Sequence, residues 1–355
     1  MKKLLITTAL TASLISSAAL AETKFGGNIE TTYTTGDRTN ATAANGTNGE
    51  GFGTDVEITV SHSKELDNGW GFKANFAIDE SGETNVAAAN RGNDEDGLAV
   101  SRSNIALTNS DLGLTIGIGS EGLQIGENYV VPSVGDVVGD IGQGGANAHY
   151  LDSINDTNNL AIAYNTPFGT VQLGATPQRT LNKDNGDSTY STTANDSGGA
   201  VEGSFGTKLL DDAVEVFVAA AQGSAQEKNG DLVNAGNTDF SERFVGASYN
   251  FGKGKIGLSR RVHSASQAGS TATDNELETD MIAVAFNISD NVSVGYQDQT
   301  TEGDSYATEE EGRVMSIGYN FGGVTFTAAK VDVDADGGVN TTNNDFWVFR
   351  TKTSF

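Results

Sequence analysis

Residues 54–79 read TDVEITVSHSKELDNGWGFKANFAID, and this stretch decides the fold class. Apolar side chains stand at every second position from Val56 to Val60 and again from Trp70 to Ile78. A period of two gives each segment one apolar and one polar face, which is typical of a β-strand. The tripeptide Asp67-Asn68-Gly69 between the two segments favours a tight turn. The stretch therefore predicts two neighbouring antiparallel strands, each with one apolar face.

The same alternation recurs along the rest of the chain. It predicts an even number of strands, as a closed antiparallel barrel requires. The sixteen predicted strands are 25–35, 54–64, 70–79, 97–108, 113–120, 158–166, 169–178, 198–208, 212–222, 240–251, 254–265, 275–288, 291–301, 310–321, 323–333 and 345–355.

The predicted connections alternate between short and long. This asymmetry is typical of outer-membrane barrels, which have tight turns at one end and long loops at the other. A β-sandwich has no reason to sort its loops in this way, and a solenoid would repeat at a constant length. The long connections are 36–53, 80–96, 121–157, 179–197, 223–238, 266–274, 302–309 and 334–344.

The first residues predict export from the cytoplasm. Lys2 and Lys3 precede an apolar stretch, residues 4–14, and Ala19-Leu20-Ala21 has the small-residue pattern of a signal-peptide cleavage site. We therefore expect a signal peptide over residues 1–21 and one barrel domain over residues 22–355. Cleavage would remove two lysines and no acids, which would change the formal charge from −26 to −28.

Composition excludes several classes of protein. So acidic a chain lacks the basic surface that nucleic-acid binding requires. There are no cysteines, so an exported protein of this sequence has no disulfide framework. No segment of the expected mature chain has 18 consecutive apolar residues, so the sequence predicts no transmembrane helix. The polar faces of the predicted strands carry charged residues, which would be costly in a dry core but belong in a water-filled barrel.

The last segment, Asp345–Phe355, ends on an aromatic residue. Together with the export signal, the sixteen predicted strands and a longest connection after the fifth strand, it resembles the general diffusion porins of Gram-negative bacteria. The acidic, glycine-rich, cysteine-free composition is closest to the alphaproteobacterial type. The resemblance covers essentially the whole mature chain. It implies a homotrimeric outer-membrane barrel among lipid and lipopolysaccharide, open to small hydrophilic solutes, with a last strand that the barrel-assembly machinery recognises.

The resemblance also implies that the third long loop, 121–157, folds into the barrel as a constriction. This loop has no lysine or arginine. The Pro-Glu-Phe-Gly run of enterobacterial members is absent, so the path of the loop stays open. Its candidate constriction acids are Glu121, Glu127, Asp136 and Asp140.

Strand parity identifies basic residues that we expect on the inner wall, opposite the loop. Our hypothesis is a transverse field between these bases and the loop acids, which orders water and dipolar solutes. The alternative is that each is an ordinary solvated charge. The same parity turns Arg260 outward, which suggests either a strand end above the lipid or an irregularity in the strand. The overall acidity predicts a mild preference for cations. The candidate wall bases are Lys73, Arg102, Arg261, Arg350 and Lys352.

Residues 332–337 read DVDADG, which matches the start of a calcium-binding loop. The candidate ligands are Asp332, Asp334 and Asp336. Asn343 stands where the closing glutamate is expected, so the bidentate ligand is missing, and part of the segment overlaps a predicted strand. An acidic solvated loop is the alternative interpretation. Nothing in the sequence requires any other cofactor.

Three alternatives compete with a general channel. An enzyme would need an activated nucleophile, but His62, His149 and His263 lie in no hydrolase or metalloprotease motif, so we do not expect one. A substrate-specific channel would carry a track of aromatic residues along its interior, where we expect only Phe217 and Phe346 as isolated exceptions. A secreted all-β binding module would be soluble without detergent.

Overall fold

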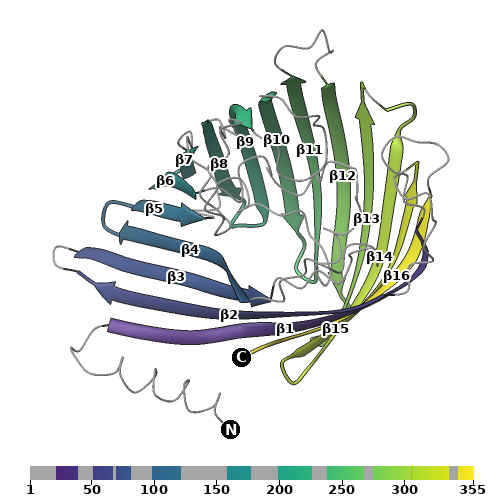
Figure 1. Cartoon of the computed structure of the whole chain (residues 1–355), viewed down its shortest axis with the longest axis horizontal. Helices are drawn as coiled ribbons and strands as arrows, with labels where there is room; N and C mark the ends of the chain where they lie inside the picture. The colour runs from purple at the N-terminus through teal and green to yellow at the C-terminus, as the bar shows by residue number, and fades with distance from the viewer. Residues whose placement is uncertain are drawn as a thin grey trace, which may run out of the picture.

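Sixteen strands follow one another in chain order and close into one antiparallel barrel in the computed structural model (Figure 1). The structure describes residues 21–38, 51–66, 69–80, 98–120, 158–176, 199–225, 238–267, 275–304, 306–335 and 343–355. The strands are β1 (Ala21–Arg38), β2 (Gly51–Glu65), β3 (Trp70–Glu80), β4 (Leu98–Asn109), β5 (Leu114–Ser120), β6 (Asn158–Thr166), β7 (Gly169–Thr176), β8 (Ala200–Leu209), β9 (Val214–Ala225), β10 (Thr238–Asn250), β11 (Gly254–Gln267), β12 (Asn275–Asn287), β13 (Val292–Gly303), β14 (Glu310–Phe321), β15 (Val324–Asp334) and β16 (Asn344–Ser354).

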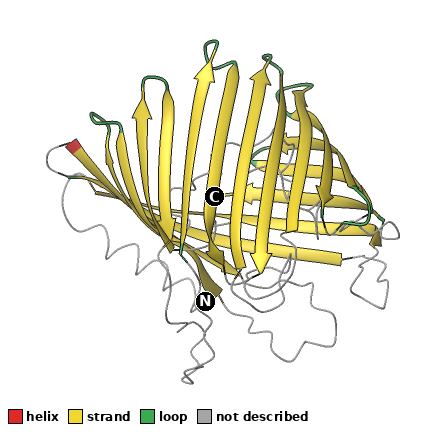
Figure 2. Ribbon diagram, turned by 90° about the horizontal axis from the view of Figure 1, so that it is seen from above, coloured by secondary structure: helices red, strands yellow, loops and turns green. Residues whose placement is uncertain are grey.

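All sixteen predicted strands are confirmed, each within a few residues of its expected bounds. The predicted tight turns are confirmed where the structure describes them, and they follow one rim of the barrel (Figure 2). At the β14–β15 turn, Gly322 and Gly323 have φ angles of 59° and 89°, which glycine adopts without the steric cost of a Cβ atom. No helix in the described part of the chain is long and apolar enough to cross a membrane.

The first and last strands close the barrel. Their register runs from Asn28 opposite Ser354 to Arg38 opposite Asn344. Beyond the last strand residue, the Phe355 amide donates to the Gly27 carbonyl at 3.0 Å. At Gly36 the two strands approach so closely that a Cβ atom would lie 2.4 Å from the Asp345 carbonyl oxygen. Gly36 also has a φ of 143°, so only glycine fits this position without strain.

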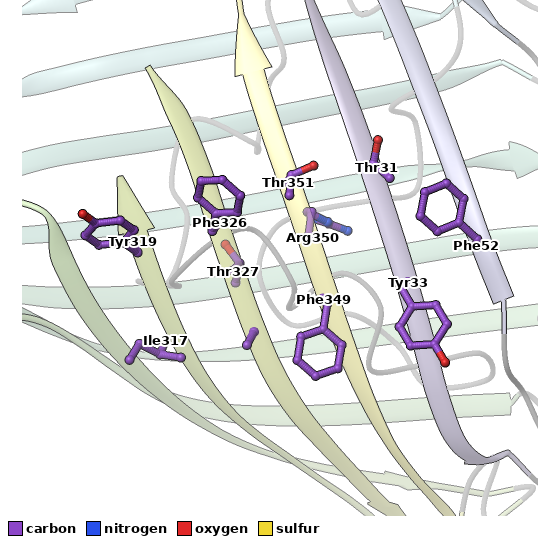
Figure 3. Close-up of a pocket in the computed structure, with 11 residues that line it drawn as sticks. Thr31, Tyr33, Phe52, Ile317, Tyr319, Phe326, Thr327, Phe349, Arg350 and Thr351 are labelled. Atoms are coloured by element: carbon purple, nitrogen blue, oxygen red, sulfur yellow. The ribbon is translucent and has the colours of Figure 1, made fainter. Parts of the chain in front are cut away.

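The side chains sort by strand parity into an apolar outer face and a largely polar inner face. On β12, outward Ile282 is 42% exposed, whereas inward Thr279 is fully buried. Outward aromatic rings sit on β1, β15 and β16, where Tyr33, Phe326 and Phe349 line a shallow apolar groove (Figure 3). The rings of Tyr33 and Phe349 stack with centroids 6.3 Å apart. Exposed apolar and buried polar side chains reverse the pattern of a soluble protein and suit a wall between lipid and water.

One irregularity bears on a predicted site residue. The pairing of β3 with β4 shifts between Ala77 and Ile78, so that Ala77 is opposite Arg102 whereas Ile78 is opposite Val100. Such a β-bulge inserts one residue and locally increases the twist. It places Arg102 at the register position of Ala77, which is buried on the inner face.

Candidate functional site

The barrel interior gathers charged side chains from strands that are distant in sequence. The first group lies at the closure, where Glu30 of β1 faces β16. Arg350 Nε is 2.8 Å from one carboxylate oxygen of Glu30, and Lys352 Nζ is 3.5 Å from the other. Glu30 and Arg350 are 15% and 11% exposed, so this ion pair is partly shielded from solvent. Two predicted wall bases therefore share one wall carboxylate that sequence reasoning did not identify.

Strand β2 adds two more acids beside this group. Asp55 is directly opposite Glu30 in the register of β1 and β2, and Glu57 is opposite Asn28. The Asn28 amide donates to Glu57 Oε1 at 3.4 Å. The inner wall near the closure therefore carries both signs of charge.

A buried ion pair lies across β10 and β11. Glu242 is fully buried and forms a salt bridge with Arg261, whose side chain is 7% exposed. His263 Nδ1 lies 3.9 Å from the second carboxylate oxygen of Glu242. The Phe240 ring stacks on His263 with centroids 6.4 Å apart. Glu242 balances the charge of Arg261 inside the wall, so this predicted base offers no free positive charge to the interior.

A third group near the tight-turn rim was missed at the sequence level. Glu215 of β9 accepts from Lys255 Nζ at 2.7 Å and lies 3.4 Å from Lys208 Nζ. The Ser248 hydroxyl donates to the same carboxylate at 3.3 Å. The signal was present, because Lys255 has the inward parity that selected Arg261 on the same strand.

The remaining predicted residues are placed as follows. Lys73 lies on the inward parity of β3, opposite Ser63, and forms no ion pair with any other described residue. Arg102 is placed only by its backbone register, since its side chain lies outside the described residues. The four loop acids, Glu121, Glu127, Asp136 and Asp140, also lie outside the described residues.

Two of the three candidate calcium ligands belong to strand β15. Asp332 and Asp334 have the outward parity, since the alternate residues Val331 and Val333 are buried on the inner face. Asp332 is opposite Arg313 and Asp345 in the register. Asp336 lies outside the described residues, and among the described residues no three acidic, histidine or cysteine side chains form a group that could hold a metal ion.

The expectation of two isolated inward aromatic residues is wrong. Phe217 packs edge-on against Phe244, with ring centroids 5.9 Å apart, inside a buried cluster with members on β8, β9, β10 and β12. Phe346 belongs to a second buried cluster with valines of β14, β15 and β16. Parity alone missed this because strands such as β10 carry apolar residues on both faces, Phe240 inward and Val245 outward.

The geometry allows one kind of chemistry above others. A closed barrel of sixteen strands is wide enough to enclose an aqueous channel. Among the residues that the structure describes, its inner wall presents paired acids and bases, such as Glu30 with Arg350 and Glu242 with Arg261. Such a wall can order water and screen passing ions by charge.

Comparison with known proteins agrees with this reading. The sequence profile of a Gram-negative porin family matches residues 7–280. No curated protein matches the chain by sequence.

Solved structures of similar fold cover nearly the whole chain. An anion-selective porin from Comamonas acidovorans has a TM-score of 0.65 at 15% identity, over 94% of this chain and 100% of that one. The trimer form of OmpT, an outer-membrane protein of Vibrio cholerae, has a TM-score of 0.63 at 12% identity, over 95% and 100%. The outer-membrane channel DcaP of Acinetobacter baumannii has a TM-score of 0.64 at 11% identity, over 96% and 99%. At these identities the likeness concerns the fold.

Proposed function

This chain belongs to the Gram-negative porin family, and from that premise we propose that it forms a water-filled pore for the passive diffusion of small hydrophilic solutes and ions. Its place is the outer membrane, and its family is one of channels rather than enzymes. The observation that carries the proposal is a closed sixteen-stranded barrel whose inner wall bears charged side chains. The pore is mildly cation-selective, because the chain has a formal charge of −26 that enriches cations at its mouths.

Neutralising the loop acids tests the proposed cation selectivity. Glu127→Gln with Asp136→Asn removes two negative charges from the segment proposed to narrow the pore. We expect the reversal potential in a KCl gradient to move toward that of an anion-selective channel, because fewer carboxylates attract potassium. Single-channel recordings in planar bilayers measure it. The control is Asp332→Asn, which removes an outward charge; an unchanged selectivity in the loop variant would refute the transverse field.

The structure also predicts a change in ion selectivity for the variant Glu30→Gln. Arg350 and Lys352 would lose their shared carboxylate and leave unpaired positive charge on the inner wall. We expect selectivity to shift toward anions by at least as much as it does when one loop charge is removed. Glu30 and Arg350 are partly buried, so dissolved ions screen their charges only weakly. The reversal potential again measures the change. Glu278→Gln, which alters an outward carboxylate, should leave it unaltered; a Glu30→Gln channel with wild-type selectivity contradicts the assignment.

The proposed working form is a homotrimer of three pores surrounded by lipid and lipopolysaccharide. The terminal strand β16 and Phe355 are proposed as the signal for the barrel-assembly machinery. No cofactor is needed for diffusion, and a structural calcium ion at Asp332, Asp334 and Asp336 remains a proposal that calcium titration of the purified protein can examine. Conductance steps in groups of three support the trimer.

A substrate-specific channel is the second candidate. The inward Phe217, Phe240 and Phe244 favour it, because such a channel would carry a track of aromatic residues along its interior. These rings, however, are only 3–7% exposed. A track that guides a solute must present its faces to the pore. The cluster therefore acts as packing of the wall, and general diffusion is the better-supported function.

A further inference from the structure

The inward side chains of the barrel differ in their access to water. On every strand from β8 to β16, at least two inward side chains are no more than 9% exposed. Thr279 of β12, Thr301 of β13 and Val331 of β15 are fully buried, although strand parity turns them toward the lumen. An inward side chain beside a water-filled lumen would stay exposed. The inner face of β8 to β16, which we call the covered wall, is therefore shielded from water at these positions.

The inner face of β1 to β3 is more accessible, and we call it the open wall. Asp55 of β2 and Lys73 of β3 are inward and exposed. Thr32 of β1 is inward and partly exposed. Glu57 and Ala77 are buried, at 8% and 3% exposure, so the open wall is not uniform. Water reaches the inner face on this side of the barrel, and an ion dissolved in that water can approach the side chains there.

The charges of the covered wall are poorly placed to act on a passing ion. Glu242 and Arg261 form a salt bridge, and their side chains are 0% and 7% exposed. Opposite charges in contact largely cancel at a distance, so an ion in the pore meets a nearly neutral pair. Glu202 of β8 is also inward and is 8% exposed. Parity alone puts these three residues on the same footing as a charge of the open wall, and burial separates them.

Asp55 has the surroundings that a selectivity-determining charge requires. It is directly opposite Glu30, which lies near the middle of β1, so it stands inside the barrel rather than at its mouth. Glu30 balances only one of the two bases, Arg350 and Lys352, that share it. Asp55 forms no ion pair with another residue that the structure describes, and its exposed carboxylate offsets the remaining positive charge. Without it, the open wall would be basic at this level.

We propose that ions cross the barrel along the open wall of β1 to β3, and that Asp55 is the residue of this wall that turns the pore away from anion selectivity. The inference rests on the proposed diffusion pore and specifies which side of the lumen conducts and which carboxylate the ions meet. The inward charges of the covered wall, Glu202, Glu242 and Arg261, have no part in the selectivity.

The absence of cysteine allows single-cysteine accessibility to test the path. Thr59→Cys and Thr279→Cys are a matched pair, because both replace an inward threonine, one partly exposed on β2 and one fully buried on β12. Each variant is reconstituted in lipid vesicles and treated with a small, water-soluble methanethiosulfonate, and mass spectrometry follows the modified fraction. We expect the thiol at position 59 to react at least about tenfold faster, because a buried thiol reacts only when the wall opens locally.

A second pair guards against a variant that fails to fold. Thr32→Cys on β1 and Thr301→Cys on β13 again replace a partly exposed and a fully buried threonine, and the same order of rates is expected. Equal rates within both pairs, or faster reaction on β12 and β13, overturn the proposed path. Conductance of the unmodified variants is measured separately. Conducting channels with the wrong order of rates leave the diffusion pore standing, whereas an absence of conductance refutes the pore itself.

The variant Asp55→Asn tests the residue. We expect it to lower the ratio of potassium to chloride permeability by about twofold or more, because an exposed wall charge acts on ions within a screening length of about 8 Å. Glu202→Gln is the matched control, since it neutralises an inward carboxylate of the covered wall, and it should leave the ratio unchanged. The reversal potential in a KCl gradient measures both. Wild-type selectivity in Asp55→Asn, or an equal shift in the two variants, overturns the assignment.

Discussion

Replacing Glu242 with leucine is expected to lower the free energy of unfolding by about 3–5 kcal/mol, the usual cost of removing one partner from a buried ion pair. Glu242 is fully buried and Arg261 is 7% exposed, so the arginine would keep its charge with no carboxylate beside it. Its neighbour His263 cannot replace the lost negative charge. Unfolding by guanidinium in lipid vesicles, followed through the two tryptophans, Trp70 and Trp347, measures the change.

Two controls isolate the cause. Asp280→Asn weakens the outward pair with Arg260, whose side chains are about half exposed, and should cost only about 0–1 kcal/mol. The double variant Glu242→Leu with Arg261→Met replaces both charges by apolar groups and should recover most of the lost stability. A double variant no more stable than Glu242→Leu alone would mean that the ion pair does not explain the loss.

Gly36→Val is expected to prevent normal closure of the barrel. A Cβ atom at Gly36 would lie 2.4 Å from the Asp345 carbonyl oxygen and 2.5 Å from Phe346 Cα, both backbone atoms that cannot move aside cheaply. The φ of 143° adds strain for any β-branched residue. Backbone strain costs about 1–3 kcal/mol and overpacking about 1–3 kcal/mol, and both costs fall on the β1–β16 pairing that closes the barrel.

The measurement is the fraction of protein that remains a folded barrel in SDS without heating, seen as a shifted band on a gel. Gly51→Val is the matched control, because a Cβ atom there meets nothing within 4 Å. It should leave the folded fraction near that of the wild type. If both valine variants folded equally well, the close approach of β1 and β16 at Gly36 would not govern closure.

Much of the fold was predictable because each strand has a local alternation of apolar and polar residues. Alternation in a segment such as 70–78 identifies a strand and its outward face without knowledge of its neighbours. Outward Arg260 followed from parity alone, and the structure places it above the apolar rows of the wall, paired with Asp280. Parity failed where a strand is apolar on both faces, as β10 is at Phe240 and Val245.

The candidate site was predictable only in part. Parity chose Arg261, Arg350 and Lys352 for the inner wall, and the structure places all three there. It did not reveal that Glu242 and Glu30 neutralise them. A carboxylate becomes the partner of an arginine through the register between strands, and no local pattern encodes that register.

The sequence by itself determined the strands, the order of tight and long connections, and which side chains of each strand share a face, because all three depend on local periodicity. Only the tertiary structure decided which inward charges meet. Glu30 and Arg350 come from opposite ends of the chain and become neighbours because β1 pairs with β16.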